Sequence, residues 1–147
     1  AVNWPTGLGG KVNEGVSSLV KQTPNSIGYV ELIYAKQNDI DYAVVKNAAG
    51  KWLKADIAGV TAAAAGAKMP ADYRVSITDA PGEKSYPIAS YTWLLIYQRN
   101  PGETGKLMRD FLKWMLKDGH GMATELGYAP LPESVKAMVA KTIETIK

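Results

Sequence analysis

The sequence has 147 residues, 46% of them hydrophobic and 21% charged, which is enough for one domain with a buried core and excludes a largely disordered chain. The net charge is +3, and the cationic residues are scattered among acidic ones, so no basic run indicates nucleic acid binding. Cysteine is absent and His120 is the only histidine, so we predict no disulfide, no metal site and no cofactor.

Targeting signals are also missing from the sequence as it stands. No stretch approaches the ~20 apolar residues that span a bilayer. The first residues, AVNWPTG, lack the basic start and apolar core of a signal peptide. We therefore expect either a cytosolic protein or one whose beginning has been removed.

The first half of the chain predicts short strands that alternate with helices. Apolar residues recur at helical spacing from Lys11 to Gln22, and residues 27–30 form a candidate strand that passes into a helix. Residues 42–53 predict a hairpin with a turn at residues 48–50. The alanine-rich stretch 57–68 predicts a helix that lies on the surface.

The second half begins with a strand over Tyr73–Thr78 and a turn-rich break over Asp79–Pro87. The run Tyr91–Gln98 is apolar on both faces, which is typical of a central strand. Two amphipathic helices follow, one over Glu103–Asp118 and one after Pro132. Alternating strands and helices favour an α/β fold, yet one strand between the break and the helices cannot form a sheet.

The glycine-rich stretch NWPTGLGGKVNEG, residues 3–15, could hold an anion at a helix start or could be a tight turn. Pro5 stands where a P-loop has its first glycine, and Val12 stands where a P-loop has its hydroxyl. Val12 also occupies the last glycine position of a dinucleotide-binding motif. The sequence therefore favours a tight strand-to-helix turn, with Lys11 a solvated cation.

The remaining residues that could take part in binding or catalysis are better explained as structural or solvated residues. Trp93 and Trp114 lie in apolar patterns, which favours core positions over carbohydrate stacking. His120 lies between two glycines with no nucleophile motif nearby, so we interpret it as a surface loop residue. Four carboxylates have no pattern that buries them together and are expected to be solvated: Glu14, Glu31, Asp39 and Asp41. We predict no catalytic residues and no enzyme activity.

Five segments, in this order, resemble the second half of the PstS family, the phosphate-binding proteins of bacterial phosphate ABC transporters: NWPTGLGGKVNEGV, IGYVELIYAKQN, YPIASYTWLLIY, FLKWML and LGYAPLPESV. The resemblance implies an α/β fold, as part of a two-domain periplasmic binding protein (type II) that lacks its N-terminal half. Residues 1–85 would be the latter part of the second, cleft-forming domain. Residues 86–147 would be a crossover strand and C-terminal helices that belong to the first domain.

The resemblance also says where phosphate would be held. The family's main ligands are a Thr and Ser loop and an Asp in the first domain, and an Arg with a Ser-Gly-Thr turn in the second. All of them precede the Trp-Pro segment, so they are absent from this chain. The candidates that remain for lining the cleft are Thr6, Gly7, Gly9, Gly10 and Lys11. Val12 departs from the pattern, because we expect glycine there in the family.

The implied function is high-affinity phosphate binding and delivery to an ABC importer in the periplasm, as one half of the solute-binding protein. The implied partners are inorganic phosphate, the membrane permease of the transporter, and an N-terminal half-chain or a second copy. The alternative is a fragment or subunit that acts as an interaction module, complementing a separate N-terminal chain without binding ligand of its own. Phosphate and other oxyanions stay open as ligands, because the discriminating residues lie elsewhere.

Overall fold

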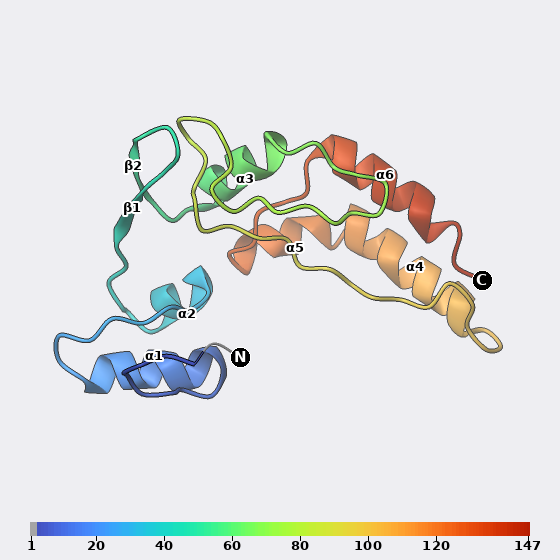
Figure 1. Ribbon diagram of the computed structural model, residues 1–147. Coiled ribbons are helices and arrows are strands. Elements are labelled where there is room, and N and C mark those ends of the chain that lie inside the picture. The colour runs from blue at the N-terminus through green and yellow to red at the C-terminus, as the bar shows by residue number, and fades with distance from the viewer. Residues whose placement is uncertain (1–2) are drawn as a thin grey trace. The chain divides into compact units, whose positions relative to one another are not determined.

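The computed structural model describes residues 3–147 (Figure 1). Over that range the chain folds into helices and one small sheet, with these bounds in chain order: α1 (Val12–Gln22), α2 (Leu32–Gln37), β1 (Val44–Lys46), β2 (Trp52–Lys54), α3 (Ile57–Ala65), α4 (Thr104–Lys117), α5 (His120–Glu125) and α6 (Glu133–Ile143). The chain forms two compact units, one ending at Ala43 and the other beginning at Val44, and each is described by itself.

In the first unit, α1 and α2 pack together and the chain between them crosses α1. The Asn13 side chain on α1 accepts a hydrogen bond from the backbone N–H of Glu31, just before α2, at 3.0 Å. A Cβ atom added to Gly28 would lie 2.7 Å from a methyl group of Val20, so a larger residue would force this side chain to shift. The helix predicted from Lys11 is confirmed. The strand predicted at residues 27–30 is wrong, because this segment lies against a helix and joins no sheet.

The second unit begins with the predicted hairpin, which is confirmed. β1 and β2 pair antiparallel, with Val45 opposite Leu53. The Asn47 side chain is buried beside the turn and donates to the backbone oxygens of Gly82, Glu83 and Ser85 at 3.0 to 3.1 Å. The predicted break at residues 79–87 is therefore a loop fastened to the hairpin.

Helix α3 contributes to the first of two hydrophobic clusters in this unit. Asp56 caps it by accepting a hydrogen bond from the backbone N–H of Gly59. The helix is confirmed, but its predicted surface position is wrong, because Ala63 is fully buried. Small side chains let the neighbouring chain approach closely. The buried members of this cluster, called cluster A, are Ala63, Ala64, Ile77, Ala80 and Ala89.

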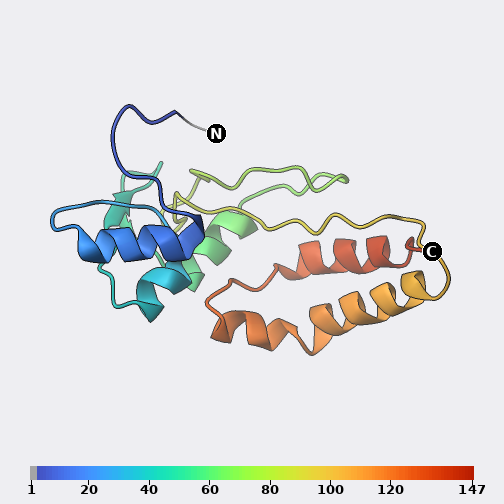
Figure 2. The ribbon, with the colours of Figure 1, turned by 90° about the horizontal axis from the view of Figure 1, so that it is seen from below.

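Helices α4 and α6 lie side by side and antiparallel (Figures 1 and 2), and both are confirmed. Their contact forms a second cluster, called cluster B, whose buried members are Leu112, Ile143 and Ile146. The short helix α5 follows α4 directly. His120 begins α5 and is half-buried, so its interpretation as a surface loop residue is wrong.

The two segments predicted as strands, residues 73–78 and 91–98, are extended but pair with no strand among the described residues. The side chains of Leu95 and Tyr97 are 96% and 85% exposed. Trp93 and Trp114 are also nearly half exposed, so their predicted core positions are wrong. No described residue covers this face of the segment or the outer face of α4. Within residues 3–147, the only regular sheet is the hairpin.

Candidate functional site

The turn that holds the five candidate residues precedes α1. Thr6, Gly7, Gly9 and Lys11 are exposed, and Gly10 is half-buried. Gly7 has a φ of 109°, a conformation that glycine adopts readily. The strand that a strand-to-helix turn implies before these residues is not observed, because Trp4 is in no strand.

Gly10 fixes the path of this turn. A Cβ atom at Gly10 would lie 2.6 Å from the backbone nitrogen of Val16 and 2.7 Å from the carbonyl carbon of Gly15. By contrast, a Cβ atom at Gly9 would meet nothing within 4 Å. The turn therefore packs closely on the backbone of α1, because Gly10 has no side chain. This close packing fits the tight turn that the sequence analysis favoured over an anion site.

The start of α1 offers donors to an anion but does not enclose one. The first N–H groups of a helix have no partner within the helix, and the helix dipole favours negative charge there. Lys11 stands at the N-cap position, and its side chain makes no capping hydrogen bond. Glu14 lies in the first turn and already places a carboxylate near this end. The local field therefore favours a bound anion less than an uncharged first turn would.

Val12 is the first residue of α1 and has a φ of 54°. This left-handed conformation is rare for a β-branched residue and easy for glycine. Glycine would adopt this backbone conformation more easily than valine does, and the expected glycine in the PstS family stays a prediction. The valine also adds a side chain beside the turn, and this residue is 65% exposed.

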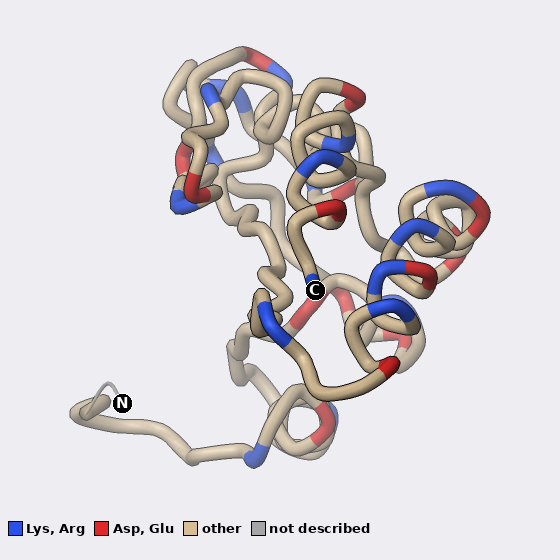
Figure 3. The backbone as a smooth tube through the Cα atoms, turned by 90° about the vertical axis from the view of Figure 1, so that its right-hand side faces the viewer, with Lys and Arg blue, Asp and Glu red and all other residues tan. Residues whose placement is uncertain are grey.

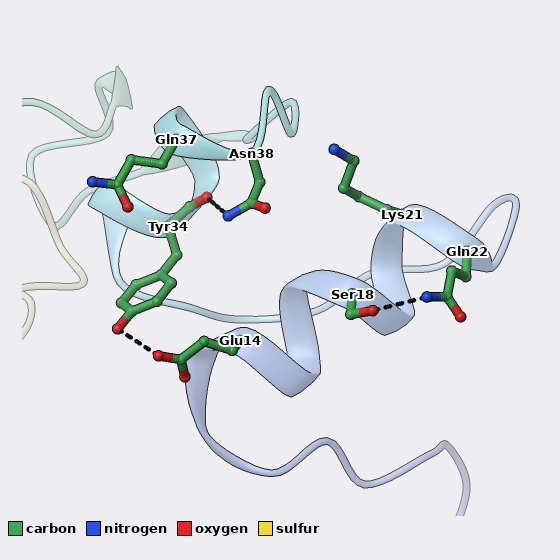
Figure 4. A pocket seen from close by; sticks show the side chains of 7 residues that line it. All are labelled: Glu14, Ser18, Lys21, Gln22, Tyr34, Gln37 and Asn38. Carbon is green, nitrogen blue, oxygen red and sulfur yellow. Dashed lines mark hydrogen bonds between the residues drawn. The ribbon is translucent and has the colours of Figure 1, made fainter.

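A polar hollow of about 510 Å³ lies between α1 and α2 (Figure 4). Two of its lining side chains are joined from α2 to α1, because the Tyr34 hydroxyl donates to a carboxylate oxygen of Glu14 at 3.1 Å. This hydrogen bond and the charge of Glu14 raise the pKa of Tyr34 above its ordinary value of 10.0, with a smaller effect from the charge of Glu31. Seven residues line the hollow: Glu14, Ser18, Lys21, Gln22, Tyr34, Gln37 and Asn38.

No motif in the sequence indicated this hollow, because its lining comes from two helices whose mutual packing no motif encodes. Of the five candidate residues, Gly10 lines a second hollow of about 310 Å³, together with Val12, Asn13, Val16 and Tyr29. The four carboxylates expected to be solvated are all exposed. Among the described residues, no three His, Cys, Asp or Glu side chains gather as metal ligands would.

The charged residues are mixed in sign over the structure, as they are along the sequence. Basic and acidic positions are interspersed over the backbone in Figure 3, with no run of one sign. Lys113 on α4 forms an ion pair with Glu144 beyond α6 at 2.7 Å. No helix within residues 3–147 combines the length and the apolar character needed to cross a bilayer.

Comparison with known proteins identifies the family. Residues 3–119 match the family described as "PBP superfamily domain". The chain belongs to the PBP superfamily. The match runs from the glycine-rich turn to just beyond the end of α4, so it takes in the described part of the first unit and the second unit up to residue 119.

Curated relatives in the superfamily are named phosphate-binding protein PstS. The chain is 42% identical over 138 residues to the one from Xylella fastidiosa, covering 92% of this chain and 38% of the relative. It is 41% identical over 149 residues to the one from Haemophilus influenzae, covering 99% and 44%. It is 34% identical over 165 residues to the one from Methanocaldococcus jannaschii, covering 99% and 42%.

These relatives confirm the resemblance to PstS proteins that the five segments indicated. The chain spans about two fifths of the length of the relatives it matches. The relatives are named for binding a solute, with no catalytic activity in those names. The superfamily match fits a periplasmic binding protein fold. The helices and the hairpin described above would be parts of that fold.

Proposed function

We propose that this chain is part of a periplasmic solute-binding protein that binds inorganic phosphate and delivers it to the membrane permease of an ABC importer. The observation that carries the proposal is the 41–42% identity to phosphate-binding proteins over 92–99% of the chain. Neither the site geometry nor the charge pattern favours catalysis over binding.

Phosphate binding would require groups beyond this chain. The candidate turn is exposed, and Lys11 with the first N–H groups of α1 approaches an anion from one side only. A dianion is held tightly when several donors surround it in a site that excludes water. On this proposal Thr6, Gly7, Gly9, Gly10 and Lys11 line the cleft and contribute positive potential. The principal ligands come from the part of the relatives' length that this chain does not match.

The two-domain type II arrangement belongs to the same proposal. Residues 1–85 contribute the latter part of the cleft-forming second domain, and residues 86–147 return to the first domain. The exposed extended segment at residues 91–98 supports this arrangement. Its backbone has no strand partner among the described residues, and a segment apolar on both faces suits the middle of a sheet.

A second candidate function is that of an interaction module that complements a separate N-terminal chain, without binding phosphate alone. The specific observation in its favour is the uncovered apolar surface beside that segment. On α4, Leu107 and Phe111 are 65% and 53% exposed, next to the exposed Trp114. A surface of this kind on a protein of this size marks an interface. The occupant is an N-terminal half-chain, or a second copy that exchanges elements.

Calorimetric titration with inorganic phosphate separates these functions. The chain is titrated alone and after co-refolding with the remaining N-terminal part of a PstS relative, with sulfate as the control anion. We expect tight phosphate binding in the complemented sample and little or none by the chain alone. Failure of the complemented sample to bind phosphate, while it forms a stable complex, would leave the interaction module as the function.

A further inference from the structure

The outer side of the hairpin is a small surface that combines a tryptophan with lysines. Lys46 lies opposite Trp52 in the pairing of β1 with β2. Val44 lies opposite Lys54 in the same pairing. Residues directly opposite each other share one side of a sheet, and so do alternate residues of one strand. These four side chains therefore lie together, on a surface that we call the hairpin face.

The hairpin face is open to solvent. All four of its residues are exposed, with Trp52 at 67% and Val44 at 52%. The middle residues of the two strands, Val45 and Leu53, lie on the opposite side of the hairpin and are half-buried. An exposed indole carries a large apolar area with one polar N–H. Covering this area by a partner that tolerates both characters would be favourable.

The charge of the hairpin is entirely positive. Residues 44–54 contain three lysines and no acidic residue. Lys51 stands beside the turn and forms an exposed ion pair with Glu83 from the neighbouring loop at 3.7 Å. Trp52 has Lys46 directly across the ladder and Lys54 two residues along its own strand. The partner that complements the hairpin face is thus negatively charged.

The hairpin is held firmly beside α3 in the second unit (Figure 1). The Asn47 amide donates to three backbone oxygens in residues 82–85, and its oxygen accepts a hydrogen bond from the backbone N–H of Lys51 at 2.9 Å. At the other end, Ala55 is buried and Asp56 caps α3. A surface that is already fixed loses little conformational entropy when a partner covers it.

The small size of the hairpin face favours a lipid surface over a folded protein. A specific protein interface takes about 800 Å² and roughly 20–30 residues from each partner, far more than four side chains supply. A bilayer surface requires no matching shape. Tryptophan concentrates at the boundary between lipid and water, and lysine lays its stem on apolar surface while its ammonium stays among polar groups.

We propose that the hairpin face docks on bilayers that contain anionic lipid, with Trp52 among the headgroups and Lys46 and Lys54 against lipid phosphates. One indole and a few lysines give weak and reversible attachment, because stable anchoring takes stronger signals, such as two lipid chains. The proposal goes beyond the proposed function, since a lipid surface is a partner distinct from phosphate and from a permease.

Vesicle flotation tests the proposal on the 147-residue chain, without phosphate. One set of vesicles contains phosphatidylcholine alone, and the other contains phosphatidylcholine and phosphatidylglycerol in equal amounts. Exposed apolar side chains elsewhere in the chain contact both lipids alike, so the measured quantity is the ratio of affinities for anionic and neutral vesicles. We expect a ratio of about ten or more at low salt. High salt should bring the ratio close to one, because it screens the charges.

A matched pair of double variants tests the lysines. Lys46→Gln with Lys54→Gln removes two charges from the hairpin face and is expected to lower the ratio several-fold. Lys21→Gln with Lys36→Gln makes the same change of net charge at two exposed positions of the first unit. This control is expected to keep the ratio near that of the unmodified chain.

A second matched pair tests the indole. Trp52→Thr removes the ring and keeps a residue that suits a strand. It is expected to weaken binding to anionic vesicles several-fold. Trp4→Thr is the control, because Trp4 is 66% exposed and Trp52 is 67% exposed. Circular dichroism shows whether each variant is folded, and the lysine variants serve if Trp52→Thr does not fold.

Three results would overturn the proposal. Equal binding of the unmodified chain to both kinds of vesicle would show that anionic lipid is not recognised. Equal losses in the two double lysine variants would show attraction by net charge and not by the hairpin face. A ratio near one, together with retention on polyglutamate beads that Lys46→Gln with Lys54→Gln abolishes, would assign the face to an acidic protein. Phosphate titration of the complemented protein is a separate measurement, and its failure would leave the vesicle result unchanged.

Discussion

The backbone N–H of Lys147 donates a hydrogen bond to the backbone oxygen of Gln98 at 2.7 Å. The backbone oxygen of Lys147 in turn accepts a hydrogen bond from the N–H of Asn100 at 2.8 Å. These two bonds hold the last residue of the chain beside the end of the exposed segment. The guanidinium of Arg109 on α4 also donates to the backbone oxygen of Ile146. The residues after α6 therefore fasten the end of the exposed segment to α4.

Substitution of Gly105 by alanine tests this fastening. Gly105 is buried at the start of α4, and a Cβ atom there would collide with the backbone of Lys147. We expect Gly105→Ala to lower the free energy of unfolding by roughly 1–3 kcal/mol, as overpacking does. Urea denaturation measures the change. Gly121→Ala is the control, because a Cβ atom there meets nothing within 4 Å, and equal losses in both variants would contradict the contact.

Substitution of the buried Asn47 tests whether its amide holds the loop to the hairpin. Asn47→Asp would place a carboxylate against the backbone oxygens of Gly82, Glu83 and Ser85, which now accept hydrogen bonds from the amide. Net losses of about 1 kcal/mol for each hydrogen bond, with further cost for groups left buried and unpaired, predict a loss of roughly 2–4 kcal/mol. Chemical denaturation checks this. Asn3→Asp, the same change at an exposed position, is expected to have almost no effect.

The glycine-rich turn offers a matched pair of variants in consecutive residues. Gly10→Ala forces a Cβ atom to 2.6 Å from the backbone of Val16, whereas Gly9→Ala points into open space. We expect Gly10→Ala to cost about 1–3 kcal/mol of stability through overpacking, and Gly9→Ala to cost little. Thermal unfolding followed by circular dichroism distinguishes them. Equal effects would mean that the turn is not folded against α1 as described.

The sequence pattern correctly predicted the elements that are specified by residues close together in the sequence. Helices α1, α4 and α6 and the hairpin follow from apolar spacing and turn residues, and they lie close to their predicted bounds. The surface position assigned to α3 failed because alanine indicates helix propensity but not which neighbour packs on it. Ala63 is buried because the loop ending at Ala89 lies on it, a contact between residues far apart in the sequence.

The predicted strands failed for a different reason. A strand needs a partner, and residues 27–30 and 73–78 have extended or alternating patterns without a partner strand in the part of the chain that the structure describes. Trp93 and Trp114 lie in apolar patterns, which predict burial. Both are exposed because no described residues pack over them. The buried position of Asn47 could not be predicted either, because it depends on hydrogen bonds to residues far along the sequence.

The hydrogen bond between Tyr34 and Glu14 predicts a pH dependence. The pKa of Tyr34 is raised above 10.0 chiefly by this bond. The neutral hydroxyl donates it, so its contribution to stability is present below pH 10 and is lost as the pH rises through the raised pKa. We expect Glu14→Gln to lower the pKa of Tyr34 toward its ordinary value, measured by NMR of the ring during a pH titration.

Glu31→Gln is the control for that titration, because the charge of Glu31 is the smallest of the causes that raise the pKa of Tyr34. A smaller decrease than in Glu14→Gln is expected. If the pKa of Tyr34 were the same in Glu14→Gln and in the unmodified chain, the hydrogen bond across the hollow would not persist in solution.

Amide hydrogen exchange in residues 91–98 tests the central claim most directly, namely that this segment is a sheet strand whose neighbours lie outside the described chain. Exposed backbone without a ladder exchanges fast, and backbone inside a sheet is protected. We predict fast exchange at Leu94, Leu95 and Tyr97 in the chain alone. We predict strong protection at the same residues after co-refolding with the N-terminal part of a PstS relative. Strong protection in a compact monomer of the chain alone, shown by light scattering at 15.8 kDa, would contradict the account.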